Sequence, residues 1–327
     1  MNRAEIEALV ASQLASVLTD AAFDGWPAPF RGKVRDAYDL ADGRRLLITT
    51  DRQSAFDQVL AAVPFKGQVL TATARYWFDA TADLLPNHLL EVPDPNVMVV
   101  ERLSMLPVEV VVRDYLTGST ATSIWPMYAG GARRLYGIEL PDGLARNEKL
   151  PRTLITPTTK GGEGAHDEPI APADIVARGL LTEAQWQAVA DAALALFARG
   201  RELAAARGLI LVDTKYEFGF DAHGRLKLAD EIHTPDSSRY WRQATYADRL
   251  GKGEEPDALD KDFLRRWIGA RCDPYRQPIP AIPDATRVSF ACLYIELYET
   301  VTGETFVPPA ADPPPRERLR RCLARYL

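Results

Sequence analysis

The sequence predicts a fold that combines antiparallel β-hairpins with helices, divided over two or three domains. Turn-forming residues at 41–43 and at 221–224 each separate two strand-like runs, which is typical of hairpins. A long helical pattern precedes the second hairpin, with Thr182 as its amino-terminal cap and Gly208 at its end. The length of 327 residues exceeds what one small core organises, and therefore favours more than one domain.

The composition argues against several classes of binding partner. Hydrophobic residues make up 46% and charged residues 26%, as in ordinary globular proteins. The net charge of −6 argues against general binding of nucleic acid or of anionic membranes. Three scattered cysteines are typical of a reducing compartment, and no apolar run approaches a membrane span. The first 18 residues resemble a surface helix and not a signal peptide, so we expect a cytoplasmic enzyme.

The elements of the first third follow in chain order. Residues 51–60 are expected to form a loop, and residues 71–85 a helix. The valine-rich stretch 97–113 predicts two strands joined by a short connector, because Glu101 and Pro107 interrupt it.

Turn and cap residues mark the later elements. The turn at 117–119 is expected to open a helix that runs through Trp125, and residues 126–165 are rich in loops. Residues 236–238 are good caps for a helix that would carry Arg239. The segment after residue 250 is expected to be helical with proline-rich breaks.

The second hairpin carries the strongest functional signal. Asp213, Lys215 and Glu217 occupy every second position of its first arm, so their side chains project to one side of the strand. The intervening positions supply an apolar opposite face, made of Ile210, Val212, Tyr216, Phe218 and Phe220. Without a bulge at the turn, the expected cross-strand pairs are Phe220 with Arg225, Lys215 with Asp230, and Glu217 with Leu228.

In that arrangement Asp213, Glu217 and Asp230 converge around Lys215. A purely structural sheet would gain little from such repulsion between carboxylates. A divalent cation and a polyphosphate would neutralise it. The hairpin therefore predicts an ATP site.

Other segments offer groups that suit phosphate. Gly32 lets backbone amides approach a phosphate and Lys33 supplies charge, although an ordinary turn with a solvated lysine fits the same pair. The glycine-rich stretch 156–170 is expected to be a lid that brings Lys160 onto phosphate, and it also carries Asp167.

Two arginines suggest further anion sites. Arg113 ends an apolar strand and Ser119 opens the next helix, so a guanidinium, hydroxyls and helix amides together suit a phosphate monoester. The alternative is an ordinary cap at Ser119 and a surface ion pair for Arg113. Arg239 is expected beside the acidic cluster, where it could hold a second anion. The loop 49–57 groups charge beside an apolar residue, which raises the odds of a functional loop, and its polar members include Asp51, Arg52 and Ser54.

Together these stretches resemble one family, the phosphoribosylaminoimidazole-succinocarboxamide synthases, which are the SAICAR synthetases of purine biosynthesis. The matching strings lie in the family's order between residues 32 and 241, and residues 294–306 resemble its closing helix. They are GKVRDAYDL, TTDRQSAFD, EVVVRDYLTGS, TPTTKGGEGAHDEPI, LILVDTKYEFGF and LADEIHTPDSSRYW. Two stretches depart from the pattern. The lid carries extra glycines, and residues 253–267 match only in part, so we assign no chemistry to them.

The resemblance implies a fold and a reaction. The fold is α+β, with a kinase-like nucleotide-binding amino-terminal part and an ATP-grasp-like central part. Accordingly, we expect a β-rich domain at 1–106, a central α+β domain at 107–250 and a helical segment at 251–327. The reaction joins L-aspartate to the carboxylate of the ribonucleotide CAIR, uses ATP, and yields SAICAR, ADP and phosphate. The partners are these small molecules, and the chain would be a monomer or a small homo-oligomer.

The resemblance also implies roles for single residues. Lys33 with the adjacent Gly32, together with Lys160, would contact the phosphates of ATP, and Glu217 and Asp230 would hold Mg²⁺. The ribonucleotide phosphate would bind at Arg113 and Ser119. The imidazole carboxylate and amine would be surrounded by Lys215, Asp213 and Arg239. L-Aspartate would be placed with the help of Asp51, Arg52, Ser54 and Asp167, and adenine would lie against residues 101–106.

Two rival interpretations remain at this point. A small-molecule kinase would use the same hairpin, lysines and paired carboxylates for simple phosphoryl transfer. A non-catalytic nucleotide-sensing protein would keep only a relic of the site. Dependence on an amine acceptor separates the ligase from the kinase, and release of ADP separates either enzyme from a sensor.

Overall fold

The computed structural model describes residues 1–56, 58–119, 123–160 and 167–327. Its strands are β1 (Phe30–Arg31), β2 (Arg35–Asp39), β3 (Arg44–Thr49), β4 (Arg52–Ala55), β5 (Gln58–Ala62), β6 (Leu89–Asp94), β7 (Val97–Glu101), β8 (Ser104–Tyr115), β9 (Arg134–Leu135), β10 (Ile138–Glu139), β11 (Lys149–Ile155), β12 (Thr158–Thr159), β13 (Glu168–Pro169), β14 (Leu209–Phe220), β15 (Leu226–Ala229) and β16 (Ser238–Arg242). Its helices are α1 (Arg3–Ser12), α2 (Lys66–Ala80), α3 (Ile124–Ala129), α4 (Pro172–Ala177), α5 (Glu183–Ala206), α6 (Gln243–Gly251), α7 (Asp262–Gly269), α8 (Asp284–Thr302) and α9 (Pro315–Leu323).

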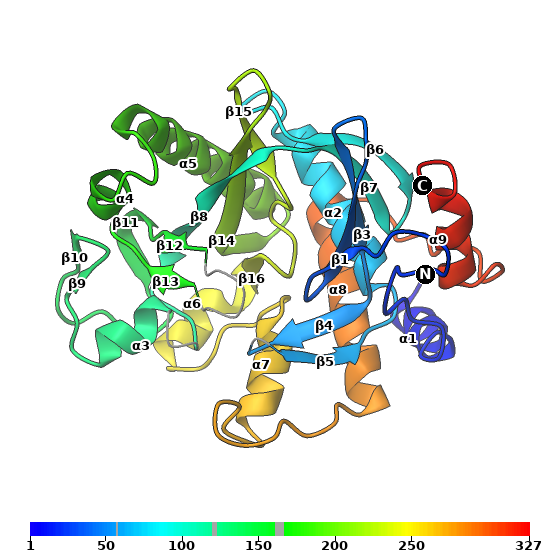
Figure 1. The fold of residues 1–327 in the computed structure, drawn as a ribbon. Helices are drawn as coiled ribbons and strands as arrows, with labels where there is room; N and C mark the ends of the chain where they lie inside the picture. Colours follow the sequence, from blue (N-terminus) through cyan, green and yellow to red (C-terminus); the bar gives the residue numbers. More distant parts are fainter. Residues whose placement is uncertain (57, 120–122, 161–166) are drawn as a thin grey trace.

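Two antiparallel sheets form the framework, and helices cover them (Figure 1). The smaller sheet has the strand order β1–β2–β3–β7–β6. The larger sheet has the order β13–β12–β8–β14–β15, with β11 also paired to β8 and β16 to β14. The mixed α+β class expected from the sequence is confirmed. No helix in the described part of the chain is long and apolar enough to cross a membrane.

The smaller sheet is built around the first predicted hairpin. Strands β2 and β3 pair from Arg35 opposite Thr49 to Asp39 opposite Arg45, and Gly43 takes the left-handed conformation at the turn. Helix α2 packs on this sheet next to α8, so the carboxyl-terminal helices rest on amino-terminal elements. The predicted amino-terminal helix covers the first 18 residues, whereas α1 already ends at Ser12.

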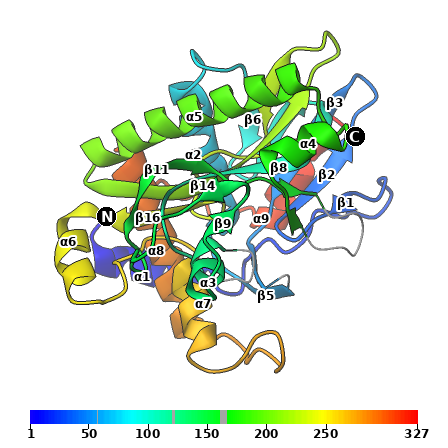
Figure 2. The same ribbon diagram turned by 90° about the vertical axis from the view of Figure 1, so that its left-hand side faces the viewer.

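Helix α5 lies along the larger sheet and closes the main core against it (Figure 2). Thr182 caps this helix in a capping box with Gln185, and Gly208 follows its end with a positive φ, as predicted. The buried stripe is also as predicted over most of its length: Trp186, Val189, Ala193, Leu196 and Phe197 are buried, and Leu203 is partly buried.

The structure corrects several predicted elements. Residues 51–60 are not a plain loop, because β4 and β5 pair there as a short hairpin. The polar residues of β4 are buried, which the hydrophobic pattern of the sequence does not predict. Pro107 lies inside β8 and not in a connector, and α3 begins after Ser123 and not at Ser119. Residues 120–122 of the predicted helix lie outside the described residues.

Arg239 lies on a strand and not on the predicted helix. Strand β16 pairs with β14, and the next helix begins only at Gln243. Tyr240 and Trp241 are buried in this strand, where aromatic side chains are favoured. Asp236 does not act as a helix cap, because its carboxylate is paired with Lys66.

The second hairpin forms, but its register differs by one residue from the expected one. Phe220 pairs with Leu226, and Glu217 pairs with Ala229. The reason is the turn, in which the Asp221 side chain accepts the backbone N–H groups of His223 and Arg225 and thereby closes a longer loop. Strand β15 therefore ends at Ala229, one residue before Asp230.

A β-bulge changes the two faces of β14. The register with β16 shifts between Leu211 and Asp213. Tyr216 and Phe218 consequently join the main core, as do Leu209 and Leu211. By contrast, Ile210 and Val212 pack in a separate cluster with Tyr115 and Trp241. The predicted single apolar face is therefore correct only for the second half of the strand.

Candidate active site

Three neighbouring strands place a row of charges across the larger sheet. In the strand register, Asp213 on β14 lies opposite Arg113 on β8 and opposite Arg239 on β16. The Asp213 carboxylate lies 2.5 Å from a guanidinium nitrogen of Arg239 and 3.4 Å from one of Arg113. Arg239 also lies 3.5 Å from Asp262, which Arg265 shares at 3.2 Å. Three guanidinium groups therefore face two carboxylates, and we call these five residues the arginine row.

Arg113 is held firmly within this row. Its Nε donates a hydrogen bond of 2.7 Å to the Thr156 hydroxyl on the loop after β11. Burial lowers the pKa of Arg113, and the charge of Arg239 adds to this effect while Asp213 opposes it. Ser119, the predicted partner of Arg113, is exposed in the loop that follows β8.

A second group of charges lies two residues farther along β14. Lys215 Nζ lies 2.8 Å from a carboxylate oxygen of Glu109 on β8 and 2.6 Å from one of Glu217. The other oxygen of Glu217 accepts a hydrogen bond from Lys160, just after β12. The sequence prediction placed Asp213 in this group, whereas Glu109 occupies that place. Asp213 belongs to the arginine row.

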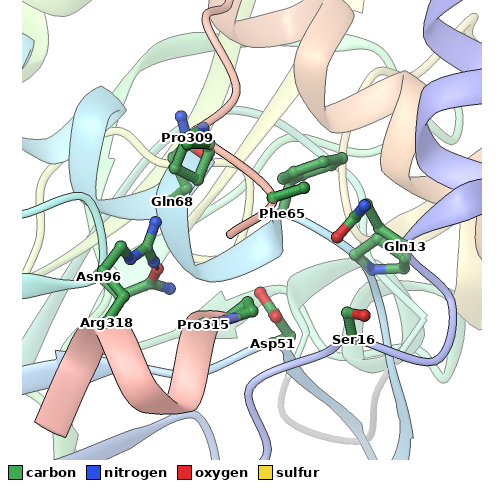
Figure 3. Close-up of a pocket in the computed structure, with 12 residues that line it drawn as sticks. Gln13, Ser16, Asp51, Phe65, Gln68, Asn96, Pro309, Pro315 and Arg318 are labelled. Carbon is green, nitrogen blue, oxygen red and sulfur yellow. Dashed lines mark hydrogen bonds between the residues drawn. The ribbon is translucent and has the colours of Figure 1, made fainter. Parts of the chain in front are cut away.

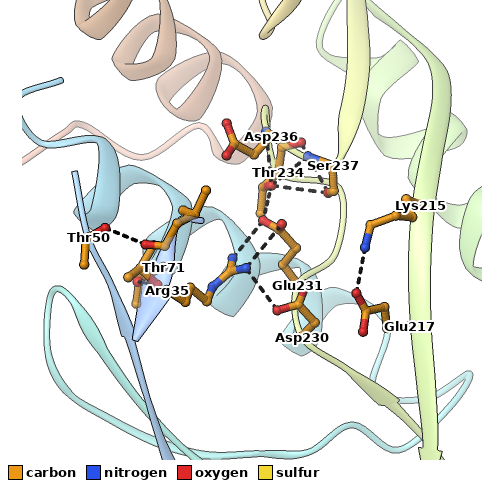
Figure 4. Close-up of polar contacts among 12 residues, drawn as sticks. Arg35, Thr50, Thr71, Lys215, Glu217, Asp230, Glu231, Thr234, Asp236 and Ser237 are labelled. Carbon is orange, nitrogen blue, oxygen red and sulfur yellow. Dashed lines mark hydrogen bonds and ion pairs between the residues drawn. The ribbon is translucent and has the colours of Figure 1, made fainter. Parts of the chain in front are cut away.

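Asp230 completes the group from the turn after β15. It adopts the left-handed backbone conformation with φ 58°, which directs its side chain out of the strand. Arg35 on β2 of the smaller sheet lies 3.0 Å from Asp230 and 2.9 Å from Glu231. Figure 4 shows Asp230 and Glu217 next to each other, between Arg35 and Lys215. We call Glu109, Lys160, Lys215, Glu217, Asp230, Arg35 and Glu231 the carboxylate cluster.

The acids of the carboxylate cluster differ in their pKa. Burial raises the pKa of Asp230 to about 6, and the negative charges of Glu217 and Glu231 add to it while Arg35 opposes it. Burial also acts on Glu217, but the charges of Lys215 and Lys160 outweigh it and hold the pKa of Glu217 well below its ordinary value. Burial raises the pKa of Glu109, and the charges of Glu217 and Asp167 raise it further.

The carboxylate cluster is not a preformed metal centre. Within the described ranges, no group of three or more histidine, cysteine, aspartate or glutamate side chains is arranged to hold a metal ion. The donor chemistry of Glu217 and Asp230 nevertheless fits Mg²⁺, because Mg²⁺ is commonly held by one or two carboxylates while phosphates and waters fill its remaining positions.

The first hairpin contributes Gly32 and Lys33 near this site. Gly32 N donates to the carbonyl of Arg35 at 2.8 Å, and a Cβ on Gly32 would lie only 2.9 Å from that oxygen. Glycine is therefore required by the tight turn itself. Lys33 is exposed at the tip of this turn. Arg52 fastens the turn, since its guanidinium donates to the carbonyls of both Gly32 and Lys33.

The remaining residues predicted for aspartate lie in different places. The other donors of Arg52 reach the Thr19 carbonyl and the Asp36 carboxylate, so all of its N–H groups have protein partners. Asp51 accepts the backbone N–H groups of Leu18 and Gly67, and burial raises its pKa to about 6 against the effect of these bonds. Both residues therefore serve internal contacts, and their direct contact with a ligand stays a prediction.

Ser54 and Asp167 are the other two residues predicted for L-aspartate. Ser54 is buried in β4. Asp167 is exposed, and its charge contributes to the raised pKa of Glu109 in the carboxylate cluster. The predicted lid lies outside the described residues over positions 161–166.

A pocket lies between the end of α1, the start of α2 and residues 309–318 (Figure 3). Asp51 borders it, as do Gln68 and Arg318. None of the other residues predicted for the site lines this pocket. The chemistry expected from the sequence is therefore centred on β14 and not on this pocket.

The sequence does not predict five charged residues of the two charge groups, namely Glu109, Arg35, Glu231, Asp262 and Arg265. Glu109 has a visible signal, since it is the one acid in the valine-rich run VEVVV. Arg35 and Glu231 have no such signal, because they pair across elements that are distant in the sequence. Asp262 and Arg265 lie in the stretch 253–267, to which the sequence assigns no chemistry. Contacts between the two sheets cannot be inferred from the alternation within one hairpin.

Comparisons with known proteins agree with this geometry. The family model described as SAICAR synthetase matches residues 29–282. A phosphoribosylaminoimidazole-succinocarboxamide synthase of Legionella pneumophila (strain Paris) is 52% identical over 299 residues, which cover 91% of this chain and 95% of that protein. The SAICAR synthase of Saccharomyces cerevisiae, solved in complex with SAICAR, shares 33% identity and a TM-score of 0.76, covering 89% of this chain and 100% of that chain.

A further solved structure, a SAICAR synthetase (type 2) in complex with ADP, has 25% identity and a TM-score of 0.66. The match covers 86% of this chain and 100% of that chain. The family match and the 52% identity extend over most of the sequence, and the family match includes every strand of the charged site. On these grounds, the chain belongs to the SAICAR synthetase family.

Proposed function

We infer that the chain is an ATP-dependent ligase of purine biosynthesis, which joins L-aspartate to the carboxylate of CAIR and yields SAICAR, ADP and phosphate. Relatives of this chain were solved with SAICAR and with ADP, which are two products of this reaction. The observation that carries the proposal is the placement of two charge groups of opposite balance on β14. The arginine row suits an anionic ribonucleotide, and the carboxylate cluster suits a metal-bound nucleotide.

Mg²⁺ would be held by Glu217 and Asp230. When bound there, it would neutralise the terminal phosphates of ATP and polarise the γ-phosphoryl group. Lys160 already reaches Glu217 from the segment before the lid, so a small movement would carry its ammonium group onto phosphate. Lys33, on the turn fastened by Arg52, would contact phosphate from the opposite sheet, with the backbone of Gly32 close by.

The ribonucleotide phosphate would lie at Arg113 and Ser119. Arg239, Asp213 and Lys215 would surround the imidazole carboxylate and its neighbouring amine. Support comes from the strand register, which places Asp213 between both arginines and only two residues from Lys215. The carboxylate to be activated would consequently lie between the arginine row and the γ-phosphate.

The reaction would proceed in two steps. An oxygen of the CAIR carboxylate attacks the γ-phosphorus of ATP, the bond from that phosphorus to the bridging oxygen of ADP breaks, and an acyl phosphate forms. The α-amine of L-aspartate then attacks the acyl carbon, loses a proton, and displaces phosphate together with the former carboxylate oxygen. Lysine and arginine side chains offset the growing negative charge, so positioning and electrostatic stabilisation supply the catalysis.

L-Aspartate would enter near Ser54 and Asp167. Asp51 and Arg52 would support this region through the backbone that they fasten, because both are engaged in internal hydrogen bonds. Adenine would lie against residues 101–106, where β7 passes into β8. Lys227 on β15 bonds to Glu101 and braces this connector.

The finer organisation is part of the same proposal. The kinase-like and ATP-grasp-like parts would correspond to the two sheets, with divisions near residues 106 and 250. Support comes from the sheets themselves, since all strands of the smaller sheet lie before residue 102 and all strands of the larger sheet lie between residues 104 and 242. A cytoplasmic location and a monomer or small homo-oligomer remain predictions.

An ADP-release assay tests the proposed function. Purified protein is supplied with Mg²⁺ and ATP, then with CAIR, then with CAIR and L-aspartate. Sustained ADP release that requires all three substrates, together with formation of SAICAR, supports the ligase. Sustained release with CAIR alone and accumulation of a phosphorylated product would instead identify a small-molecule kinase, and no release under any condition would contradict both.

A further inference from the structure

The turn at 117–119, which follows β8, lies against the arginine row. Gly118 has a φ of 106°, and a Cβ at this position would lie 3.5 Å from a guanidinium nitrogen of Arg239 and 2.4 Å from the Ser123 side chain. The backbone of the turn is therefore closely packed and depends on glycine. Because Ser119 is a proposed ligand of the ribonucleotide phosphate, the conformation of this turn determines where its hydroxyl group lies.

The side chain of Asn147 holds the first residue of this turn. The Thr117 hydroxyl donates a hydrogen bond of 2.6 Å to the side-chain oxygen of Asn147. Both residues are only 4% exposed, so water competes little for this bond. The backbone N–H of Asn147 donates to the carbonyl of Leu116 at 2.8 Å, and the backbone N–H of Leu116 donates to the carbonyl of Glu148. Asn147 thus fastens the turn through its side chain and through its main chain.

The backbone of Asn147 has the left-handed conformation, with a φ of 65°. Asparagine adopts this conformation more readily than most residues with a side chain. Glycine would satisfy the backbone equally well, but it would leave the Thr117 hydroxyl without its acceptor. The two contributions of Asn147 can therefore be separated by substitution.

Asn147 is itself held by the segment that follows β16. The Tyr246 hydroxyl on α6 donates to the Asn147 carbonyl at 2.8 Å, and the side-chain nitrogen of Asn147 donates to the Glu255 carboxylate at 3.3 Å. Glu255 also pairs with Arg146 at 3.0 Å. Because β16 carries Arg239, one continuous stretch of chain positions both this arginine and the turn beside it.

We propose that Asn147 is a positioning residue for the ribonucleotide phosphate, and that it acts through Thr117 on the turn that carries Ser119. This inference rests on the proposed function, which assigns the phosphate monoester to Arg113 and Ser119. Asn147 is buried and would act without touching the ribonucleotide. Its hydrogen bond orders the turn before the ligand binds, so binding does not have to supply the free energy of ordering. The benefit is therefore confined to ligands that carry the phosphate.

Asn147→Gly tests the proposal by steady-state kinetics, because it keeps the left-handed backbone and removes the acceptor of Thr117. The KM for CAIR should rise about 10-fold, the size expected for loss of one buried hydrogen bond. The KM values for ATP and L-aspartate, and kcat at saturating CAIR, should change less than about twofold. An unchanged KM for CAIR, or an equal rise of all three KM values, would overturn the proposal.

Variants of Thr117 test the same hydrogen bond from its donor. Thr117→Val leaves the contact between Asn147 and Glu255 in place and should also raise the KM for CAIR about 10-fold. Thr117→Ser keeps the hydroxyl and should stay within about twofold of the wild type. The double variant of Thr117→Val and Asn147→Gly should again show a rise of about 10-fold, because both changes remove one interaction. A rise of about 100-fold would show that the two residues act separately and would overturn the proposal.

Thr81→Val is the matched control for loss of a buried hydroxyl. Thr81 follows the end of α2, is 1% exposed, and donates a hydrogen bond of 2.7 Å to the Trp77 carbonyl. It belongs to neither charge group, so its KM values should stay unchanged even if the free energy of unfolding falls.

Two fragments of the substrate give a readout that a merely structural role would not move. Ribose 5-phosphate retains the phosphate, and the ribonucleoside form of CAIR lacks it. Measured as competitive inhibitors of CAIR, ribose 5-phosphate should bind Asn147→Gly about 10-fold more weakly than the wild type, whereas the ribonucleoside should bind both proteins within about twofold. An equal loss for both fragments would show that the substitution disturbs the whole site, and would overturn the proposal.

The outcomes distinguish this inference from the proposed function. If the wild type does not consume CAIR with ATP and L-aspartate, the proposed function itself is wrong. If the wild type consumes CAIR but neither Asn147→Gly nor Thr117→Val changes its KM, only this inference fails. Should Asn147→Gly fail to fold, Thr117→Val carries the same test with both inhibitors, and an unchanged affinity for ribose 5-phosphate would overturn the proposal.

Discussion

The two charge groups on β14 lie two residues apart, yet their balance of charge is opposite. The arginine row has three guanidinium groups for two carboxylates. The carboxylate cluster has four carboxylates for three cations. Each surplus is costly in a partly buried site unless a ligand of opposite charge binds there. The difference supports the proposed division of ligands, with an anionic ribonucleotide at the arginine row and a metal-bound nucleotide at the carboxylate cluster.

Removal of a carboxylate from the carboxylate cluster should have the largest expected effect on turnover. Glu217→Gln should lower kcat about 10³-fold, or about 4 kcal/mol, because the metal and both lysines lose their shared partner. Binding of CAIR, measured by isothermal titration, should remain within about threefold of the wild type. If CAIR binding is lost along with turnover, the two groups on β14 are not separate sites and the comparison fails.

Removal of a cation from the arginine row should weaken the binding of CAIR and leave the binding of nucleotide unchanged. Arg239→Ala should raise the KM for CAIR about 100-fold, or about 2.7 kcal/mol, because one of the guanidinium partners of the anion is lost. Affinity for a nonhydrolysable ATP analogue should change less than twofold. Arg249→Ala is a control, since Arg249 is a half-exposed arginine on α6. Loss of nucleotide binding in Arg239→Ala would contradict the separation of the two groups.

The opposite face of β14 supplies a buried group without any counter-charge. His233 is fully buried, and its Nε2 lies 2.5 Å from the Tyr216 hydroxyl. Burial lowers the pKa of His233 to about 3. The folded state therefore keeps His233 neutral, while the unfolded chain takes up a proton as the pH falls through about 6.5. This contribution to stability is present above pH 6.5 and is lost progressively towards pH 3.

At pH 5 the loss should amount to about 2 kcal/mol in the free energy of unfolding. His233→Gln retains a polar atom for Tyr216 but does not titrate, so its stability should fall less than that of the wild type between pH 7.5 and pH 5. Urea unfolding of both proteins at both pH values measures the difference, and His88 cancels because both proteins contain it. If the free energy of unfolding falls equally with pH in both proteins, His233 can be protonated in the fold. A buried charge without a counter-charge would then be tolerated on this face of β14.

The sequence predicts well what depends on local pattern. The alternation of Asp213, Lys215 and Glu217, the capping of α5 by Thr182 and the first hairpin all follow from spacing that a single element decides. The family resemblance then predicts the reaction, because several matching strings in the family's order are specific to that family.

The sequence does not predict what depends on contacts between elements. The register of the second hairpin depends on the Asp221 side chain, and the polar strand β4 is stabilised by a buried ion pair between Arg52 and Asp36. Arg239 lies on β16 because β14 offers it a pairing edge, which overrides the capping residues before it. The pairing of Arg35 with Asp230 joins residues from both sheets, and no local pattern reports it.

The smallest expected effect separates two carboxylates that share one lysine. Glu109 and Glu217 lie opposite each other on β8 and β14, and both contact Lys215, but only Glu217 also contacts Lys160. Glu109→Gln removes one negative charge while Glu217 still holds both lysines. We therefore expect the apparent Kd for Mg²⁺ and kcat each to change about threefold, measured by Mg²⁺ titration of the turnover rate. A loss as large as that of Glu217→Gln would place the metal between the two glutamates, and Asp230 would then belong to Arg35 alone.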